Sequence, residues 1–306
     1  MTDLKLGTTD LLIVNACIID GSGAPRFYGA VSVLADKITG VFNQDQPQFK
    51  NTLELLRATS KCVFDAKGQV LSPGFIDAHT HDDRLLLSHP QMTPKVSQGV
   101  TTVVAGNCGI SLAPMNKHLS SGVIPPLNLL DETGEWFKYK TFSNYLQTIT
   151  THPSSVNCAF LVGHTSLRVG VMSDLTQAAS AHEIELMRAH VVEALEAGAI
   201  GVSTGLYYEP AFAASAQEVI EVCRPLAKYG GLYCTHMRDE GDGILSGLDE
   251  SFLIARELEV PLIISHLKVV GMNNYGKSPL ALAHIQAHQK NQEICFDCYP
   301  YPASST

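Results

Sequence analysis

Residues 74–83 read GFIDAHTHDD and follow the segment VLSP at residues 70–73. The run is mostly apolar as far as Ala78 and then turns polar, which is typical of a buried strand that ends at this point. Because residues two apart on an extended segment project to the same side, we expect His79 and His81 to point together. A histidine pair with this spacing is a candidate metal site, although ordinary polar residues at a strand end can look the same.

The rhythm of short apolar strands continues beyond this stretch. We expect strands at residues 71–81, 100–109, 156–165, 199–206, 231–236, 261–268 and 293–301. Amphipathic helices separate the later ones, and alternating strands and helices predict a parallel sheet. Seven such strands predict an α/β fold of the (β/α)8 TIM-barrel type, incomplete, with about seven βα units.

Two helix starts are marked especially clearly. Ser180 and Glu183 have the spacing of a capping box ahead of the amphipathic residues 184–197, and a glycine follows as a stop. Ser215 and Glu218 repeat the same spacing, and we expect that helix to run on to the next pair of glycines.

The N-terminal part has a different composition. The segments DLLIVNACIID and GAVSVLADKITGVF are rich in β-branched residues and read as strands, with a turn at residues 35–37. We therefore divide the chain into a small β domain at residues 1–70 and a barrel at residues 71–306.

Composition excludes several classes of protein. Of the 306 residues 45% are hydrophobic and 17% charged, which indicates a globular chain. The net charge of -9, without a Lys/Arg run, argues against a nucleic-acid partner. No apolar window is long enough for a membrane helix and no secretory signal is visible. The eight cysteines are scattered, which favours a reducing compartment, so we expect a cytoplasmic protein.

Three other predicted strands end in a residue that can bind metal, namely Cys108, His236 and His266. Each follows a run that should be buried, where a polar group needs a reason, and the carboxyl ends of barrel strands share one face. Taken singly, each can be explained as a satisfied core residue, and for Cys108 that explanation is the better one, because free cysteines are usually buried. Together with His79 and His81 they offer imidazole and thiolate ligands on one face, which predicts a zinc site.

Several motifs together resemble the N-acyl-D-amino-acid deacylases (D-aminoacylases) of the amidohydrolase superfamily: PGFIDAHTHDD, GVTTVVAGNCGISLAP, LVGHTSLR, GVSTGLYYEP, THMRDE, ISHLK and DCYPYPASST. The resemblance runs from about Asp10 to the last residue. The histidine pair marks the superfamily, and Cys108 marks this branch, because many relatives carry a lysine or glutamate there. The resemblance implies that residues 71–306 form a metal-dependent hydrolase barrel and residues 1–70 the N-terminal part of a composite β-sandwich.

The resemblance also implies roles for individual residues. The implied metal ligands are His79, His81, Cys108, His236 and His266. The residues implied to face the substrate are Lys268, Tyr208, Tyr299 and Ser305. Residues expected to support these groups from behind, without binding the metal, are Asp77, His164 and Arg168. The expected cofactor is Zn2+, with one ion held tightly and room for a second, weaker one.

The implied reaction is the zinc-dependent hydrolysis of a linear amide, which converts an N-acyl-D-amino acid to a carboxylate and a D-amino acid. Zinc lowers the pKa of its bound water to about 7, and a general base must then take the water's proton. In the family this base is an aspartate at the end of the eighth strand. The sequence reaches only the seventh, so we expect the base beyond Thr306 and expect the chain alone to be catalytically impaired.

Two other interpretations stay open. A cyclic amidase of the dihydroorotase or hydantoinase type would keep the superfamily and change the substrate, but such enzymes usually carry a bridging lysine, which GNCG and ISHLK disfavour. A non-catalytic, truncated metal-binding protein is the other. Cys295 and Cys298 also have redox or zinc spacing, but no second such pair exists, and we expect them to be structural.

Overall fold

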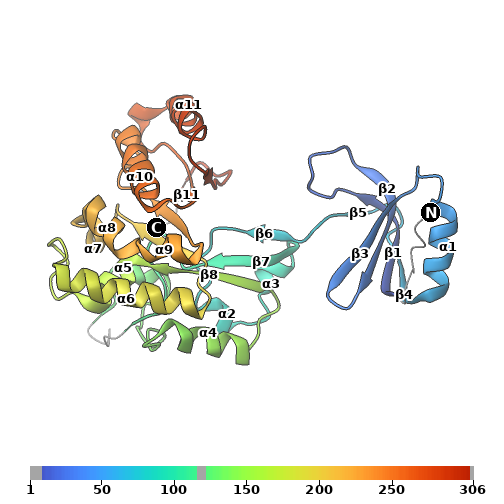
Figure 1. Ribbon diagram of the computed structural model, residues 1–306, viewed down its shortest axis with the longest axis horizontal. Coiled ribbons are helices and arrows are strands. Elements are labelled where there is room, and N and C mark those ends of the chain that lie inside the picture. The colour runs from blue at the N-terminus through green and yellow to red at the C-terminus, as the bar shows by residue number, and fades with distance from the viewer. Residues whose placement is uncertain (1–8, 116–121, 304–306) are drawn as a thin grey trace. The chain divides into compact units, whose positions relative to one another are not determined.

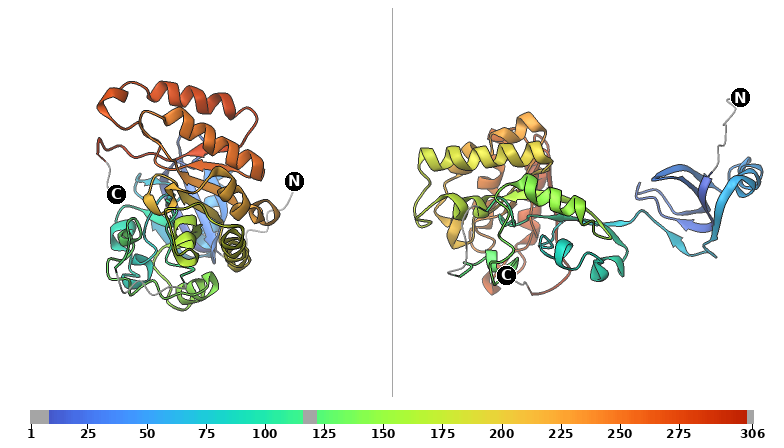
Figure 2. Two further views of the ribbon diagram at one scale, coloured as in Figure 1. Left: turned by 90° about the vertical axis from the view of Figure 1, so that its left-hand side faces the viewer. Right: turned by 90° about the horizontal axis from the view of Figure 1, so that it is seen from below.

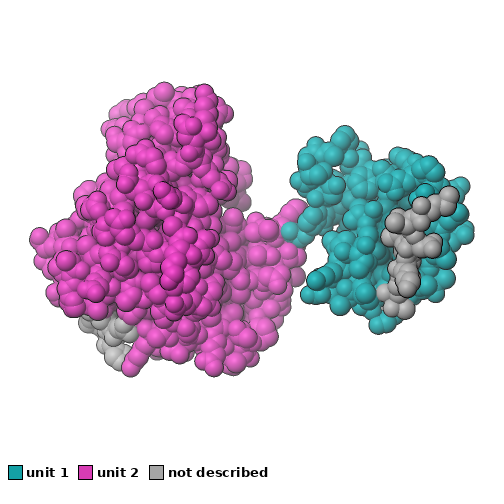
Figure 3. Space-filling model, in the orientation of Figure 1, with its two compact units in different colours: residues 1–74 teal, residues 75–306 magenta. Residues whose placement is uncertain are grey.

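The structure is a computed structural model that describes residues 9–115 and 122–303. It consists of two compact units, residues 1–74 and 75–306, which are coloured separately in Figure 3. Ser305, one of the residues predicted to face the substrate, lies outside the described residues. Within the described ranges, no helix combines the length and the apolar character needed to cross a membrane.

The first unit is a mixed five-stranded sheet with a helix against it (Figure 1). The strand order is β3-β2-β1-β4, and β5 pairs with β1. The strands are β1 (Thr9–Ile18), β2 (Phe27–Leu34), β3 (Lys37–Asn43), β4 (Ser60–Asp65) and β5 (Val70–Leu71). Helix α1 (Phe49–Thr59) was not predicted; it buries Leu56 against Leu12, Val14 and Ala30 of the sheet.

The second unit contains a seven-stranded sheet whose strands follow one another in chain order, each parallel to the next. The strands are β6 (Phe75–Asp77), β7 (Val100–Ala105), β8 (Asn157–Gly163), β9 (Gly201–Gly205), β10 (Leu232–His236), β11 (Leu262–Ile264) and β12 (Ile294–Phe296). The sheet curls into part of a barrel, with helices on its outer side (Figure 2). The prediction of a parallel barrel with seven strands in these segments is confirmed.

The connecting helices of the second unit vary in length from a single turn to 17 residues. They are α2 (Leu85–Ser88), α3 (Thr93–Val96), α4 (Phe142–Thr151), α5 (His164–Val171), α6 (Ala181–Ala197), α7 (Glu209–Phe212), α8 (Ala216–Cys223), α9 (Pro225–Tyr229), α10 (Ile244–Leu258) and α11 (Ser278–His288), with 3-10 turns at Leu127–Leu129 and Met272–Asn274. Their apolar faces and the sheet share one large buried core. This core fixes the strands, and therefore the positions at which the strands end.

Helix α6 begins as predicted. The Ser180 hydroxyl accepts from the Glu183 N–H at 3.3 Å, and the Glu183 carboxylate accepts from the Ser180 N–H at 2.8 Å. At α8 the Ser215 hydroxyl accepts from the Glu218 N–H at 3.1 Å, but the Glu218 carboxylate contacts Arg168 and the Ala179 N–H, so only half of the capping box forms. The helix also does not run on to the glycines. It ends at Cys223 and α9 starts at Pro225, because proline has no N–H to donate to the preceding turn. Arg224, between the two helices, keeps helical backbone with φ -46° and ψ -34°.

Candidate metal centre

A cavity of about 850 Å3 lies where the strands of the second unit end. Its walls come from the segments that follow β6, β7, β9, β10, β11 and β12, so residues far apart in sequence meet there. The lining includes all the described residues predicted as metal ligands or substrate contacts: His79, His81, Cys108, His236, His266, Lys268, Tyr208 and Tyr299.

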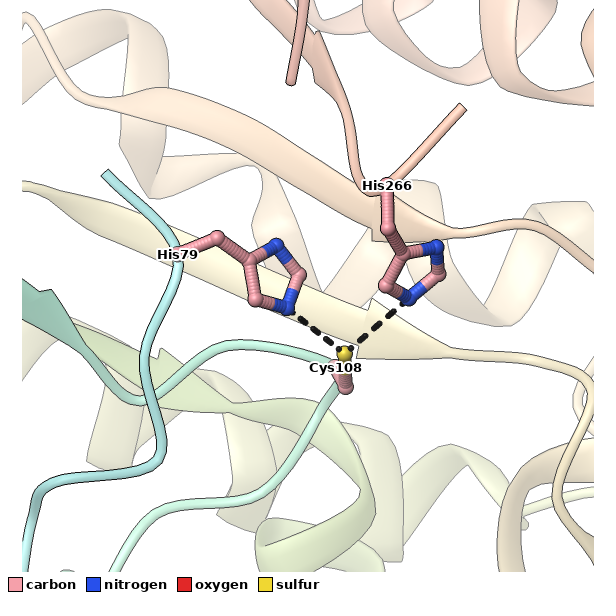
Figure 4. A group of neighbouring side chains, drawn as sticks. All are labelled: His79, Cys108 and His266. Carbon is pink, nitrogen blue, oxygen red and sulfur yellow. Dashed lines mark hydrogen bonds between the residues drawn. The ribbon is translucent and has the colours of Figure 1, made fainter. Parts of the chain in front are cut away.

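One cluster of potential ligands centres on Cys108 (Figure 4). The Cys108 Sγ lies 3.2 Å from His79 Nε2 and 3.4 Å from His266 Nε2. The two imidazoles point at the sulfur from the segments that follow β6 and β11. In the strand order β6 is one edge strand, and β11 is next to β12 at the other edge. The ring of His81 is 5.7 Å from that of His79, measured between centroids. The side chains of His79, Cys108 and His266 are therefore close enough to share one ion.

A second cluster shares His266 with the first and adds His236 and Glu240. Glu240 Oε1 lies 3.0 Å from His266 Nδ1, and Glu240 Oε2 lies 3.6 Å from His236 Nε2. The His236 and His266 rings are 4.3 Å apart between centroids. Lys268 closes this cluster, since its Nζ is 2.7 Å from Glu240 Oε2 and 2.9 Å from His266 Nδ1.

Two of the clustered residues have left-handed backbone, Cys108 with φ 52° and His266 with φ 38°. Such a conformation costs on the order of 1–3 kcal/mol in a residue other than glycine and persists only where the surroundings impose it. Gly205 makes room for the Cys108 turn, because a Cβ there would lie 2.2 Å from the Cys108 carbonyl oxygen. The strand ends thus force two of these side chains into the cavity.

Burial sets the protonation states in the cluster. It lowers the pKa of His81 to about 4 and that of His236 to about 3, helped in each case by neighbouring histidines. The imidazoles of His81 and His236 are therefore neutral near pH 7, which is the form that binds a metal. Burial also raises the pKa of the Cys108 thiol well above its ordinary value. A bound cation would reverse that shift and hold the sulfur as thiolate.

The side chains fit a zinc ion chemically. Among the described residues, His81 Nδ1 and His236 Nδ1 are buried ring nitrogens with no hydrogen-bond partner. A buried polar atom without a partner costs about 1–3 kcal/mol, so a ligand for it would be stabilising. Imidazole nitrogen and thiolate sulfur are the donors that zinc prefers.

Sequence reasoning missed two carboxylates at the centre, Glu240 and Asp297. Asp297 Oδ2 lies 3.2 Å from His79 Nδ1, and its Oδ1 accepts the His266 N–H at 2.7 Å. Burial alone would raise the pKa of each carboxyl, but the contacts with the histidines hold both below their ordinary values. Asp297 directly follows β12, so the strand-end rule that found the histidines would have found it. Glu240 is four residues beyond His236 and had no such signal.

The predicted substrate contacts lie around these clusters. The Lys268 ammonium is 5.8 Å from the centre of the Tyr299 ring. The Tyr208 ring is 4.8 Å from that of His236, and burial raises the pKa of the Tyr208 hydroxyl. A cation and phenolic hydroxyls that line one cavity can bind a carboxylate and an amide.

The three predicted supporting residues make different contacts. Asp77 Oδ2 pairs with Lys95 Nζ at 2.7 Å, just before the histidine pair. Arg168 and His164 are completely buried and both meet Glu218, which is a contact between helices and not with a predicted ligand. Arg168 Nε also donates to the Pro210 carbonyl oxygen at 2.7 Å, two residues beyond Tyr208.

Comparison with known proteins adds relatives to this geometry. The model for the amidohydrolase family matches residues 62–266. The chain is 47% identical to a D-aminoacylase and 46% identical to an N-acyl-D-aspartate deacylase, both of Alcaligenes xylosoxydans xylosoxydans. These matches take in 97% of this chain but 58% and 57% of the relatives. The chain thus spans less than two thirds of the length of the curated relatives it matches.

Solved structures give the same result. A D-aminoacylase crystal structure matches with a TM-score of 0.89 and 48% identity, over 96% of this chain and 59% of that one. The N-acyl-D-glutamate deacylase of Bordetella bronchiseptica, solved with zinc and a phosphonate inhibitor, matches with a TM-score of 0.85 and 35% identity, again over 96% of this chain and 59% of that one. A D-hydantoinase at 13% identity and a TM-score of 0.55, over 95% of this chain and 57% of that one, shares the fold alone.

Proposed function

This chain belongs to the amidohydrolase family, and from that premise we propose that it serves the zinc-dependent hydrolysis of N-acyl-D-amino acids to a carboxylate and a D-amino acid. One observation carries the proposal: imidazoles and a cysteine thiol converge from several strand ends on one cavity, with the Lys268 ammonium beside them. The likeness to a D-aminoacylase, to an N-acyl-D-aspartate deacylase and to an N-acyl-D-glutamate deacylase supports a linear amide as substrate, in preference to a cyclic one.

The ligands we propose for the metal are His79, His81, Cys108, His236 and His266. The two clusters share His266, which supports one tight ion and a second, weaker one. Zinc, when bound, makes a water molecule nucleophilic and polarises the carbonyl of the amide. The Asp297 carboxylate fixes the His79 ring through Nδ1, so that Nε2 faces the Cys108 sulfur.

The substrate is held by residues of the chain itself. Lys268 supplies the positive charge for the substrate carboxylate, and the hydroxyls of Tyr208 and Tyr299 bind the carboxylate and amide oxygens; Ser305 is proposed to join them. Glu240 orients the Lys268 ammonium through its 2.7 Å contact, so the cation is positioned before substrate arrives.

We assign positioning roles to the supporting residues. Asp77, anchored by Lys95, holds the segment that carries His79. Arg168 holds the Pro210 carbonyl and with it the turn that begins at Tyr208. His164 and Arg168 both contact the Glu218 carboxylate.

All eight cysteines lie in the described residues and are free, which supports a reducing, cytoplasmic setting.

The test uses the two enantiomers of N-acetylmethionine. The zinc-loaded chain is titrated with each by calorimetry, and amino-acid release is followed in the same samples, with a chelator-treated sample as control. We expect saturable, zinc-dependent binding or hydrolysis of the D form and at least roughly tenfold weaker interaction with the L form. Equal affinity for both forms, or no interaction with either, would overturn the proposed substrate class.

A further inference from the structure

A second group of metal-binding side chains lies outside the cavity, between two outer helices. It consists of Asp249 on α10 and of His284 and His288 on α11, and one ligand atom from each lies within 4.8 Å of the others. The two helices run side by side on the outer surface of the second unit (Figure 1; Figure 2, left). None of the residues discussed for the cavity belongs to this group.

Helical spacing brings the two histidines together. Residues four apart on a helix lie on the same face, one turn above the other. The His284 and His288 rings are accordingly 4.8 Å apart between centroids. Asp249 meets them from the other helix, with its Oδ1 2.7 Å from His284 Nε2. The group therefore joins α10 to α11 through side chains alone.

The rings are held in place by neighbours that are not ligands. Phe252 of α10 stacks on the His288 ring at 4.3 Å between centroids and also contacts the His284 ring at 5.6 Å. His288 Nδ1 lies 3.0 Å from the His284 carbonyl oxygen, and a carbonyl can only accept, so this nitrogen carries the proton. The lone pair of His288 is then on Nε2. A backbone carbonyl that fixes the tautomer in this way is typical of metal-binding histidine.

We propose that Asp249, His284 and His288 form a binding site for a divalent first-row transition-metal ion, with Zn2+ as the representative ion, that clamps α11 to α10. Two imidazoles and a carboxylate are a donor set suited to such ions and leave a position for water. At metal–ligand distances of about 2.0–2.2 Å, tetrahedral ligand atoms lie roughly 3.3 Å apart, so small side-chain movements suffice. The side chains of His284 and Asp249 are 27% and 59% exposed, so an ion can reach them.

The helix dipole also favours a cation here. His288 lies in the last turn of α11, where the helix dipole places partial negative charge. Binding requires one proton to move: the Nε2–H of His284, which donates to Asp249, passes its proton to Nδ1 or releases it to solvent, and Nε2 then offers its lone pair to the ion. The Asp249 carboxylate loses that hydrogen bond and gains a bond to the ion.

The site is tested by counting zinc and by locating it. Equilibrium dialysis at micromolar free zinc is compared for the chain, the double variant His284→Gln/His288→Gln and the control His182→Gln. His182 is an exposed histidine in the first turn of α6. We expect the double variant to bind about one zinc ion fewer per chain, the control to be unchanged, and Asp249→Asn to weaken this ion roughly tenfold.

Location is read from the unaltered chain, so a folding defect in a variant cannot obscure the result. Diethyl pyrocarbonate is applied with and without zinc, and modified peptides are measured by mass spectrometry. We expect zinc to protect His284 and His288 and to leave His182 as reactive as before. Equal zinc binding by the double variant, or unchanged reactivity of His284 and His288 in zinc, would show that the group is only an interhelical hydrogen bond and would overturn the proposal.

Discussion

Replacing Glu218 by glutamine removes the carboxylate that pairs with Arg168, a completely buried arginine. Arg168 is 0% exposed and Glu218 3% exposed, so water cannot take over the lost interaction. Breaking a buried ion pair from one side typically costs about 3–5 kcal/mol, because the remaining charge is left uncompensated. The hydrogen bonds from Arg168 to the Pro210 and Gln177 carbonyls remain, and glutamine keeps the volume. We therefore expect Glu218→Gln to lower the free energy of unfolding by about 3 kcal/mol.

A matched control lies one helical turn away. Glu221, also on α8, pairs with Arg188 and Arg224 at the surface. Such exposed pairs contribute about 0–1 kcal/mol, so Glu221→Gln should change little. Urea unfolding followed by fluorescence of Trp136, the single tryptophan, reports on the second unit alone. With an m-value of about 3 kcal/mol/M, the midpoint of Glu218→Gln should fall by roughly 1 M.

The pH dependence gives a second check on the same pair. Burial alone would raise the pKa of Glu218, but contacts with His164 and Arg168 outweigh it and lower the pKa from 4.5 to about 2. A depressed pKa contributes stability that is present above the unfolded value and is lost as pH falls from about 4.5 towards 2. The difference in free energy of unfolding between the parent chain and Glu218→Gln should therefore shrink as the pH falls from about 4.5 towards 2. A difference in this free energy below about 1 kcal/mol at pH 7, or one that stays constant in acid, would refute the reasoning.

Three further predictions concern the cavity. Cys108→Ser should weaken zinc binding at least roughly tenfold, since a hydroxyl replaces a thiolate ligand; competition with a chromophoric chelator measures this, and unchanged affinity would remove Cys108 from the ligand set. Lys268→Met should weaken binding of N-acetyl-D-methionine to the zinc-saturated chain by about 1.5–3 kcal/mol, measured by calorimetry; an unaltered affinity for this ligand would contradict the role of Lys268 in holding the carboxylate. Gly205→Ala should lower stability by about 1–3 kcal/mol and weaken zinc binding, because its Cβ would lie 2.2 Å from the Cys108 carbonyl oxygen; a variant as stable as the parent would contradict that packing.

The barrel could be predicted because its signals are local. Apolar runs that end in polar residues gave the seven strands, and the Ser180–Glu183 capping box gave the start of α6. Helix α1 was missed because it lacks such a signal: its N-cap, Gln48, makes no side-chain capping hydrogen bond. The break between α8 and α9 was missed because the expected helix was drawn across Pro225.

The candidate site was predicted unevenly for a related reason. His79, Cys108 and His266 meet because parallel strands end on one face, and this follows from strand order alone. Glu240 reaches the site from a loop, and loop paths depend on tertiary packing that sequence patterns do not encode. Asp297 follows the strand-end rule but was read as part of a cysteine motif, whose two thiols are exposed.

The zinc K-edge absorption spectrum of the chain loaded with one equivalent of zinc tests the metal centre most directly. If Cys108 and the strand-end histidines hold the ion, the spectrum will show one sulfur neighbour at about 2.3 Å together with imidazole nitrogens at about 2.0–2.1 Å. The sulfur contribution should disappear in Cys108→Ser. A spectrum of the unaltered chain with only nitrogen and oxygen neighbours would contradict the proposed centre and the hydrolytic function that rests on it.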